Sequence, residues 1–231
     1  MFRLNRAVVA PVLAEFIGAW ILVMVALVLG QTTAVSFFIA IALAIAAATV
    51  YLLFSEISGA HANPAVTFGL WTARRIGTLR GISYVAAQLL GGLVAWQLYQ
   101  YLTNHPLPTR TVPFSTPQWT AEAVGAGILV LAYAAALRRG VLALNSATAV
   151  GAAYFVAILV AATASAGFIN PAIALGSRAW SAVYVLGPLA GGLVGANLYT
   201  YFFGGAVAGR AAGTTVRRTA SRRRTTTRTR R

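Results

Sequence analysis

The feature that most constrains this chain is a series of six long apolar stretches within 231 residues. A helix needs roughly 20 predominantly apolar residues to cross a bilayer, and each stretch approaches or meets that length. Backbone polar groups in lipid must be satisfied inside their own segment, so helices are expected for all six. The sequence therefore predicts an all-α membrane protein with spans at residues 8–29, 34–54, 82–102, 119–137, 145–164 and 182–203.

The composition agrees with a bilayer environment and excludes several kinds of site. Charged residues make up 9% of the chain, whereas a soluble domain carries about 25%. Cysteine is absent, which removes disulfides, thiol nucleophiles and thiolate metal sites. The two histidines and three acidic residues are too dispersed for a metal cluster, and no nucleophile lies with a base. We therefore expect neither an enzyme nor a cofactor.

The charges indicate one orientation in the membrane. Every basic residue is an arginine, and all but Arg110 and Arg178 fall at the termini or in the loops after the second and fourth spans. Cytoplasmic loops carry the excess of basic residues, so both termini are expected in the cytoplasm. An even number of spans agrees with this, because it puts both termini on the same side of the membrane. The expected location is a plasma or inner membrane, with lipid as the surrounding partner.

An arginine-rich tail, residues 209–231, follows the last apolar stretch. It contains almost only Arg, Thr, Ser, Gly and Ala, so it cannot bury a core and is expected to be disordered. A basic cluster beside a membrane is attracted to anionic lipid. Because no aromatic residues alternate with the arginines, no specific nucleic-acid partner is expected.

The chain repeats itself at an offset of 107 residues. Residues 14–23 match residues 121–130 at seven of ten positions, and at the same offset Asn63-Pro64-Ala65 matches Asn170-Pro171-Ala172. Later the register slips by seven, which predicts a longer loop around residues 74–80 than around its counterpart. Each half holds three spans, an odd number, so the second half must enter the membrane from the opposite face. Residues 1–107 and 108–208 are therefore expected to form inverted repeats, a design that places the functional site near the membrane midplane.

The two Asn-Pro-Ala motifs are predicted to start short re-entrant helices. Asparagine is a favoured N-cap and proline a favoured first helical residue. The helical stretches that follow, at about 66–73 and 173–179, are too short to span a bilayer. In an inverted repeat their positive dipole ends meet at mid-membrane, where they repel cations. The two asparagine NH₂ groups can donate to one passing water, whose protons then face away toward both mouths.

Here the sequence resembles a known family. His61-Ala62-Asn63-Pro64-Ala65-Val66-Thr67 is similar to the signature of the aquaporin and glycerol-facilitator family, and residues 14–18 resemble its first helix. The resemblance covers residues 8–203 and implies a homotetramer in which every protomer has its own pore. It also implies that Glu15 and Glu122 brace the re-entrant loops, although a proton relay is an alternative. His61 is expected either to line the inner half of the pore or to make a structural hydrogen bond.

The sequence departs from the family at the outer constriction. Water-specific relatives place an aromatic residue, a histidine, a small residue and an arginine there, and counting from the asparagines gives Leu43, Ile158, Gly167 and Ile173. Arg178 lies five residues beyond Ile173 and is too close to the surface to replace the missing arginine. An apolar, arginine-free filter predicts a weaker preference for water over solutes such as glycerol.

Two functions remain open from the sequence. The leading one is a passive channel for water and small uncharged solutes such as glycerol, urea, ammonia or peroxide. The alternative is a proton- or ion-coupled secondary transporter with inverted repeats, which would use Glu15 and Glu122 as its only intramembrane carboxylates.

Overall fold

The six apolar stretches form helices in the computed structural model, which describes residues 5–137 and 142–204. Two further helices are short, so the chain order is α1 Arg6–Thr32, α2 Ser36–Phe54, α3 Pro64–Thr72, α4 Thr78–Thr103, α5 Thr116–Ala136, α6 Ala143–Ala161, α7 Pro171–Gly176 and α8 Ala182–Phe203. Within the described ranges, six helices are long and apolar enough to cross a membrane. The all-α fold with six spans and two half-helices is confirmed.

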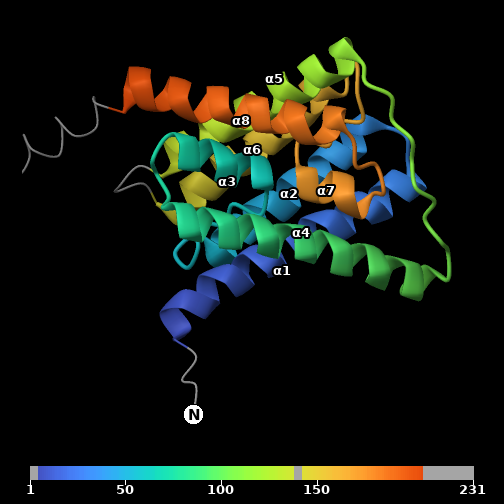
Figure 1. The fold of residues 1–231 in the computed structure, drawn as a ribbon, viewed down its shortest axis with the longest axis horizontal. Helices are drawn as coiled ribbons and strands as arrows, with labels where there is room; N and C mark the ends of the chain where they lie inside the picture. The colour runs from blue at the N-terminus through green and yellow to red at the C-terminus, as the bar shows by residue number, and fades with distance from the viewer. Residues whose placement is uncertain (1–4, 138–141, 205–231) are drawn as a thin grey trace, which may run out of the picture.

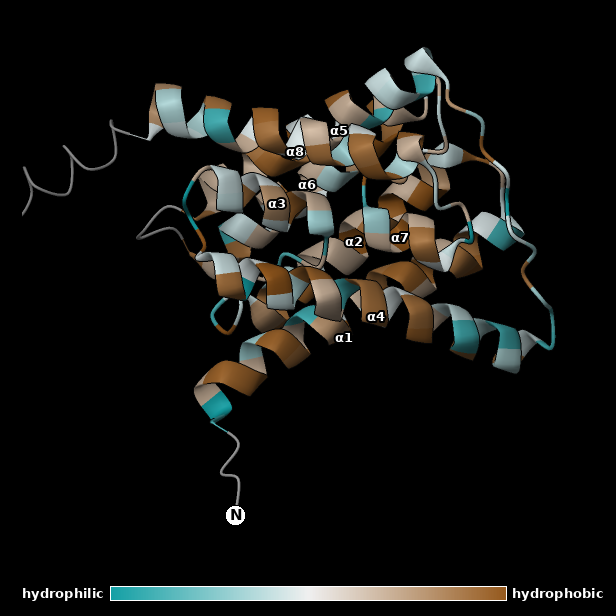
Figure 2. Cartoon of the chain, in the orientation of Figure 1, coloured by the Kyte–Doolittle hydropathy of each residue, from teal (hydrophilic) through white to brown (hydrophobic). Residues whose placement is uncertain are grey.

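The outer surface of the bundle is apolar. Large hydrophobic side chains are exposed along the long helices, among them Ile45, Ile82, Leu186 and Val194. Figure 2 shows apolar residues over most of the helical bundle, with polar residues more frequent at helix ends and in the connecting loops. This distribution fits a protein whose outer surface faces lipid rather than water.

The half-helices α3 and α7 lie end to end in the middle of the bundle, with long helices on both sides (Figure 1). The start of α1 and the end of α8 lie toward the same end of the molecule, and the loop between α4 and α5 lies toward the other. This placement agrees with termini on a common side. The arginine-rich tail and Arg138–Arg139 lie outside the described residues.

Each half-helix packs against the last long helix of the opposite half. A Cβ atom at Gly69 of α3 would overlap the carbonyl oxygen of Gly192 in α8. A Cβ atom at Gly92 of α4 would lie 2.7 Å from the carbonyl oxygen of Ala172 in α7. Small residues allow backbones to approach this closely in lipid. The glycines that recur in both repeats are therefore explained by the close packing of each half-helix against the opposite half.

The predicted longer loop around residues 74–80 is wrong as the source of the register slip. The loop after α3 and the loop after α7 have the same length, residues 73–77 and 177–181. Three of the seven residues arise because α3 has 9 residues and α7 has 6. The other four lie in the helices that carry the glycine pairs. The part of α4 before Gly91-Gly92 is about one helical turn longer than the part of α8 before Gly191-Gly192. Both insertions lie in helices rather than in the loop.

Candidate transmembrane pore

The two Asn-Pro-Ala motifs each start a half-helix. Asn63 precedes α3, and its side-chain oxygen accepts a hydrogen bond from Ala65 N at 2.8 Å. Asn170 precedes α7 and accepts from Ala172 N at 2.9 Å. The proline after each asparagine takes the first helical position, where no N–H is needed. The capping predicted from the sequence is confirmed.

The remaining amide groups of the asparagines cross between the halves. Nδ2 of Asn63 donates to the carbonyl oxygen of Ile169 at 3.1 Å, and Nδ2 of Asn170 donates to that of Ala62 at 3.2 Å. Ile169 and Ala62 both adopt the left-handed backbone region, with φ of 45° and 48°. This conformation is unfavourable for residues other than glycine and persists only where the surroundings enforce it. Each asparagine keeps a second N–H for another partner.

Two glutamates hold the loops that lead into the half-helices. Glu15 of α1 and Glu122 of α5 are both fully buried, at 0% exposure. Glu15 accepts from the hydroxyl and two backbone N–H groups of its loop, those of Ser58, His61 and Ala62, at 2.6, 3.0 and 2.7 Å. Glu122 makes the equivalent bonds to Ser165, Phe168 and Ile169, at 2.6, 3.0 and 2.6 Å. These bonds fix the loop conformations that bring the two asparagines together.

A polar network that the sequence did not reveal surrounds His61. The His61 Nδ1 atom lies 3.0 Å from the Thr67 hydroxyl, and the ring stacks edge-on against Tyr84 and Tyr133. Gln88 of α4 donates to both Glu15 at 2.6 Å and Thr67 at 2.8 Å. The signal available in the sequence was a glutamine inside an apolar span, where unpaired polar groups are costly.

Comparisons with known proteins agree with this geometry. The sequence profile described as Major intrinsic protein matches residues 3–199. The chain belongs to the major intrinsic protein family. That family comprises membrane channels and not enzymes, in agreement with the expectation from the sequence.

Several relatives of this family member are similar over much of their length. A probable aquaporin of TIP type from Medicago truncatula is 35% identical over 161 residues, which is 64% of each protein. Aquaporin TIP2-3 from Zea mays is 38% identical over 177 residues, 68% of this chain and 70% of that protein. The match thus spans slightly less than two thirds of the Medicago protein. The X-ray structure of the aquaglyceroporin from Plasmodium falciparum shares the fold, with a TM-score of 0.61, 23% identity and coverage of 83% of this chain and 95% of that one.

The four residues at the expected filter positions of this major intrinsic protein are all held in its interior. Leu43 of α2, Ile158 of α6 and Ile173 of α7 have exposed fractions of 2, 1 and 1%, and all three belong to one buried apolar cluster. Gly167 has a φ of 68°, and a Cβ atom there would lie 3.1 Å from the carbonyl oxygen of Ile158. The structure therefore places Gly167 directly against Ile158, with apolar side chains around them.

Arg178 makes its contacts at the α4–α5 loop and the end of α4, in agreement with its position five residues beyond Ile173. Its guanidinium lies over the Trp96 ring, 4.1 Å from the centroid, and donates to the Thr109 hydroxyl at 2.5 Å. Its carbonyl oxygen accepts from Arg110 N at 2.8 Å. Arg178 thus ties the α4–α5 loop to the end of α7.

The centre of the bundle is tightly filled. Asn63 and Asn170 are both fully buried, at 0% exposure. Tyr154 of α6, which no sequence pattern marks, is also 0% exposed, and its hydroxyl has no hydrogen-bond partner within the described residues. An aromatic residue in an apolar span gives no sequence signal that separates such a position from ordinary packing.

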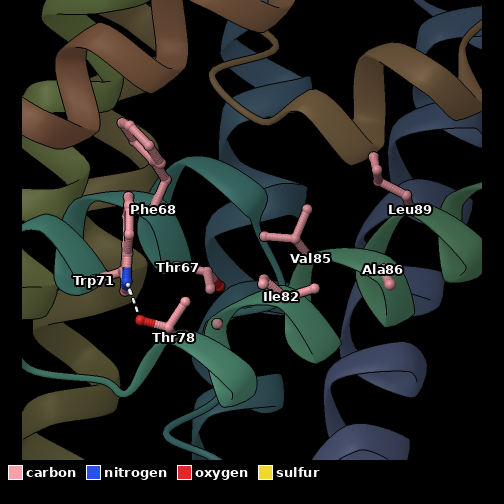
Figure 3. Close-up of a pocket in the computed structure, with 9 residues that line it drawn as sticks. Thr67, Phe68, Trp71, Thr78, Ile82, Val85, Ala86 and Leu89 are labelled. Atoms are coloured by element: carbon pink, nitrogen blue, oxygen red, sulfur yellow. Dashed lines mark hydrogen bonds between the residues drawn. The ribbon is translucent and has the colours of Figure 1, made fainter.

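A cavity of about 470 Å³ lies on the outside of the bundle, between α3 and α4 (Figure 3). Its lining is almost entirely apolar and includes Phe68, Ile82, Val85 and Leu89. The Trp71 indole N–H donates to the Thr78 hydroxyl at one end, at 3.1 Å. Several lining side chains, Trp71 and Ile82 among them, are exposed on the outer face, so this cavity is distinct from the asparagine pair.

Proposed function

We propose that this protein is a passive transmembrane channel for water and small uncharged solutes, with its selective centre at the two Asn-Pro-Ala motifs. The observation that carries the proposal is the meeting of two half-helix N-termini in the bundle, each capped by an asparagine that has a second N–H besides the one in its crossed bond. Positive helix ends at this point oppose the passage of cations, hydronium included. The two amide donors orient a passing water so that a continuous chain of proton transfer is broken.

The bonding of the glutamates supports a channel over a coupled transporter. Glu15 accepts four hydrogen bonds and Glu122 three, and neither is exposed. A carboxylate bonded in this way acts only as an acceptor. Its protonation in a transport cycle would break the bonds that hold a re-entrant loop. Bracing is therefore the role we assign to both residues.

The proposal extends to the arrangement of the chain and its assembly. Residues 1–107 and 108–208 form inverted repeats, supported by equivalent glutamate, serine and asparagine bonds in both halves. Both termini face the cytoplasm, supported by the arginine distribution. Four copies form a homotetramer with one pore each, as the resemblance to the aquaporin family implies. Residues 209–231 add a basic cytoplasmic tail.

At the apolar filter, the preference among solutes depends on how many hydrogen bonds each solute loses when it enters. Water that passes Ile158 and Ile173 gives up hydrogen bonds without replacement, at about 1–3 kcal/mol for each bond. Each 1.4 kcal/mol is roughly a factor of ten in rate. We therefore propose a weaker preference for water than in relatives with an arginine at the position of Ile173. Solutes with apolar surface, such as glycerol, should pass relatively better.

Light scattering of vesicles that contain the purified protein tests this proposal. Wild type should give passive glycerol and water flux without proton movement, read with a pH dye inside the vesicles. Ile173→Arg should lower glycerol flux and raise the water-to-glycerol ratio by about tenfold, while the matched control Ile173→Leu should leave the ratio unchanged. The proposed filter is wrong if wild type conducts water but excludes glycerol and urea, or if folded Ile173→Arg protein keeps the wild-type ratio.

A further inference from the structure

Both half-helices are followed by an arginine in an uncommon backbone conformation. Arg74 comes after the C-cap of α3 with φ of 57°, and its N–H donates to the carbonyl oxygen of Trp71 at 2.9 Å. Arg178 comes after the C-cap of α7 in the same way, with φ of 61° and a bond of 3.1 Å to Leu175. Glycine is the usual residue at this position, because a Cβ atom is unfavourable in the left-handed region. The two arginines therefore stand where the backbone alone favours glycine.

The two arginines differ in what their side chains contact. The Arg178 guanidinium stacks on an indole ring of α4 and bonds to a hydroxyl of the α4–α5 loop. The Arg74 side chain is exposed and makes no hydrogen bond, ion pair or ring contact with the described part of the chain. The same is true of its neighbour Arg75, whose guanidinium would lie 3.3 Å from a Cβ atom at Gly204. The loop after α3 thus presents two unpaired guanidinium groups beside the end of α8.

A polar pocket and an apolar groove meet beside Arg74 and Arg75. Both arginines line the polar pocket, of about 670 Å³, together with Trp71 and Thr78. Trp71 and Thr78 also line the cavity of about 470 Å³ between α3 and α4, which we call the α3–α4 groove and which reaches Leu89 at its other end (Figure 3). From Thr78 to Leu89 the groove extends about 16 Å along α4, at 1.5 Å per residue. That length is roughly half of the 30 Å hydrocarbon core of a bilayer, which is the depth of one leaflet.

These features match the parts of an anionic phospholipid. Guanidinium groups bind phosphate through paired N–H donors, and basic pockets between membrane helices bind acidic lipid headgroups. The groove has the depth and the apolar lining that an acyl chain needs when its phosphate lies at the arginines. Trp71, 40% exposed, bonds to Thr78 at the junction, and tryptophan is favoured at the boundary between headgroups and chains. A second copy of this chain fits less well, because a symmetric contact would bring two pairs of arginines together.

We propose that the α3–α4 groove binds an anionic phospholipid of the leaflet on the side where α8 ends, with the phosphate on Arg74 and Arg75 and one acyl chain along α4 as far as Leu89. The site uses only the outer face of the bundle, so it does not depend on the channel function. The bound lipid joins the end of α3 to α4 from outside. It gives the first half-helix the kind of contact that α7 obtains within the chain, through Arg178.

Native mass spectrometry of the full-length protein with added phosphatidylglycerol measures this binding. Phosphatidylcholine with the same acyl chains carries no net charge and should bind about tenfold more weakly. Arg74→Gln and Arg75→Gln should each weaken phosphatidylglycerol binding about fivefold, the contribution of one basic side chain near anionic lipid. The matched control is Arg110→Gln, which removes one exposed charge in the α4–α5 loop and should leave binding unchanged. Every variant keeps the arginine-rich tail, so the attraction of the tail for anionic lipid is the same throughout.

Filling the groove tests the place of the acyl chain. Ala86 is exposed and lines the groove, so Ala86→Phe puts a ring where the chain would lie. We expect this variant to bind both lipids about tenfold more weakly, because apolar contact is lost. Val94→Phe is the matched control, since Val94 is an exposed residue of the same helix outside the groove. It should bind both lipids as wild type does.

Three results would overturn the proposal. One is phosphatidylglycerol binding at the wild-type level in both arginine variants, or an equal loss in Arg110→Gln. Another is normal lipid binding by Ala86→Phe, which would place the lipid outside the groove. The third is a protein that retains neither lipid but forms oligomers that Ala86→Phe abolishes, which would assign the groove to a second copy. The substituted side chains are all exposed, so each variant should keep the wild-type melting midpoint in lipid-free detergent.

Discussion

The two re-entrant loops are held by equivalent glutamates, yet the first lies in a polar network and the second in apolar packing. Around Glu15 lie His61, Thr67 and Gln88, joined by hydrogen bonds. The aligned residues of the second half are Phe168, Ala174 and Pro188, which offer no side-chain hydrogen bond at all.

What both halves share shows what the fold requires. Each has a glutamate, a serine hydroxyl, two backbone N–H groups and a crossing asparagine. The polar side chains found only in the first half are additions to that common set. We infer that they serve the inner half of the pore, and substitutions that make the halves alike or unlike can test this.

The largest effect is expected from the two glutamates. The two oxygens of Glu15 each accept two hydrogen bonds, whereas Oε2 of Glu122 accepts one. Glutamine has a single side-chain oxygen, and its NH₂ group cannot accept a hydrogen bond. Glu15→Gln therefore leaves two donors without an acceptor. Glu122→Gln leaves only one donor without an acceptor when the NH₂ group takes the place of Oε2. Each orphaned buried donor costs about 1–3 kcal/mol, so Glu15→Gln should lose roughly twice as much stability.

Thermal midpoints of the detergent-purified proteins measure this difference. The control is Glu56→Gln, since Glu56 is exposed and its substitution should leave the midpoint at the wild-type value. Equal losses for Glu15→Gln and Glu122→Gln would mean that the fourth bond, from Gln88, adds nothing to the first half. Normal midpoints with loss of a pH-dependent flux would instead favour the coupled transporter.

An intermediate effect is expected for Gln88→Leu, which makes the first half resemble the second. It removes one hydrogen bond to a charged group, worth about 1.5–3 kcal/mol, and one to Thr67. The other three bonds to Glu15 remain, so the loss should be smaller than for Glu15→Gln. Gln97→Leu, at an exposed position of the same helix, is the matched control in the same melting experiment. A loss as large as that of Glu15→Gln would show that the network, not the shared set, holds the loop.

The smallest effect is expected for His61→Phe, which copies Phe168. The backbone N–H of residue 61 still donates to Glu15, and only the side-chain bond to Thr67 is lost. A neutral hydrogen bond of this kind contributes about 0.5–1.5 kcal/mol. We expect a small drop in the melting midpoint together with a changed water permeability, because we infer that the ring lines the inner half of the pore. An unchanged permeability with a large drop in stability would assign His61 to the fold alone.

The parts of the structure that could be predicted from the sequence were those governed by local rules. Span length fixes the long helices, and the Asn-Pro pair specifies a capped helix start, which is why α3 and α7 begin at Pro64 and Pro171 as expected. The bracing role of Glu15 and Glu122 followed from the resemblance, and the structure supplies the bonds that carry it.

The parts that could not be predicted depend on which distant side chains meet. Gln88 and Thr67 come together only because α3 folds back beside α4, and the sequence does not encode that distance locally. The sequence alone does not show which element holds the seven extra residues, and the structure shows that they lengthen α3 and α4 rather than the loop.

The packing of α3 against α8 also bears on how the protein is made. The surface on which Gly69 rests includes Gly192, which leaves the ribosome about 120 residues later, roughly 6–25 s at about 5–20 residues per second. Irregular backbone is not tolerated against lipid, so the first re-entrant loop has to wait in water at the membrane surface until the last helix arrives. The first half-helix therefore reaches its final position only after α8, the last helix, has been inserted. A nascent chain released before α8 would lack the helix against which α3 packs.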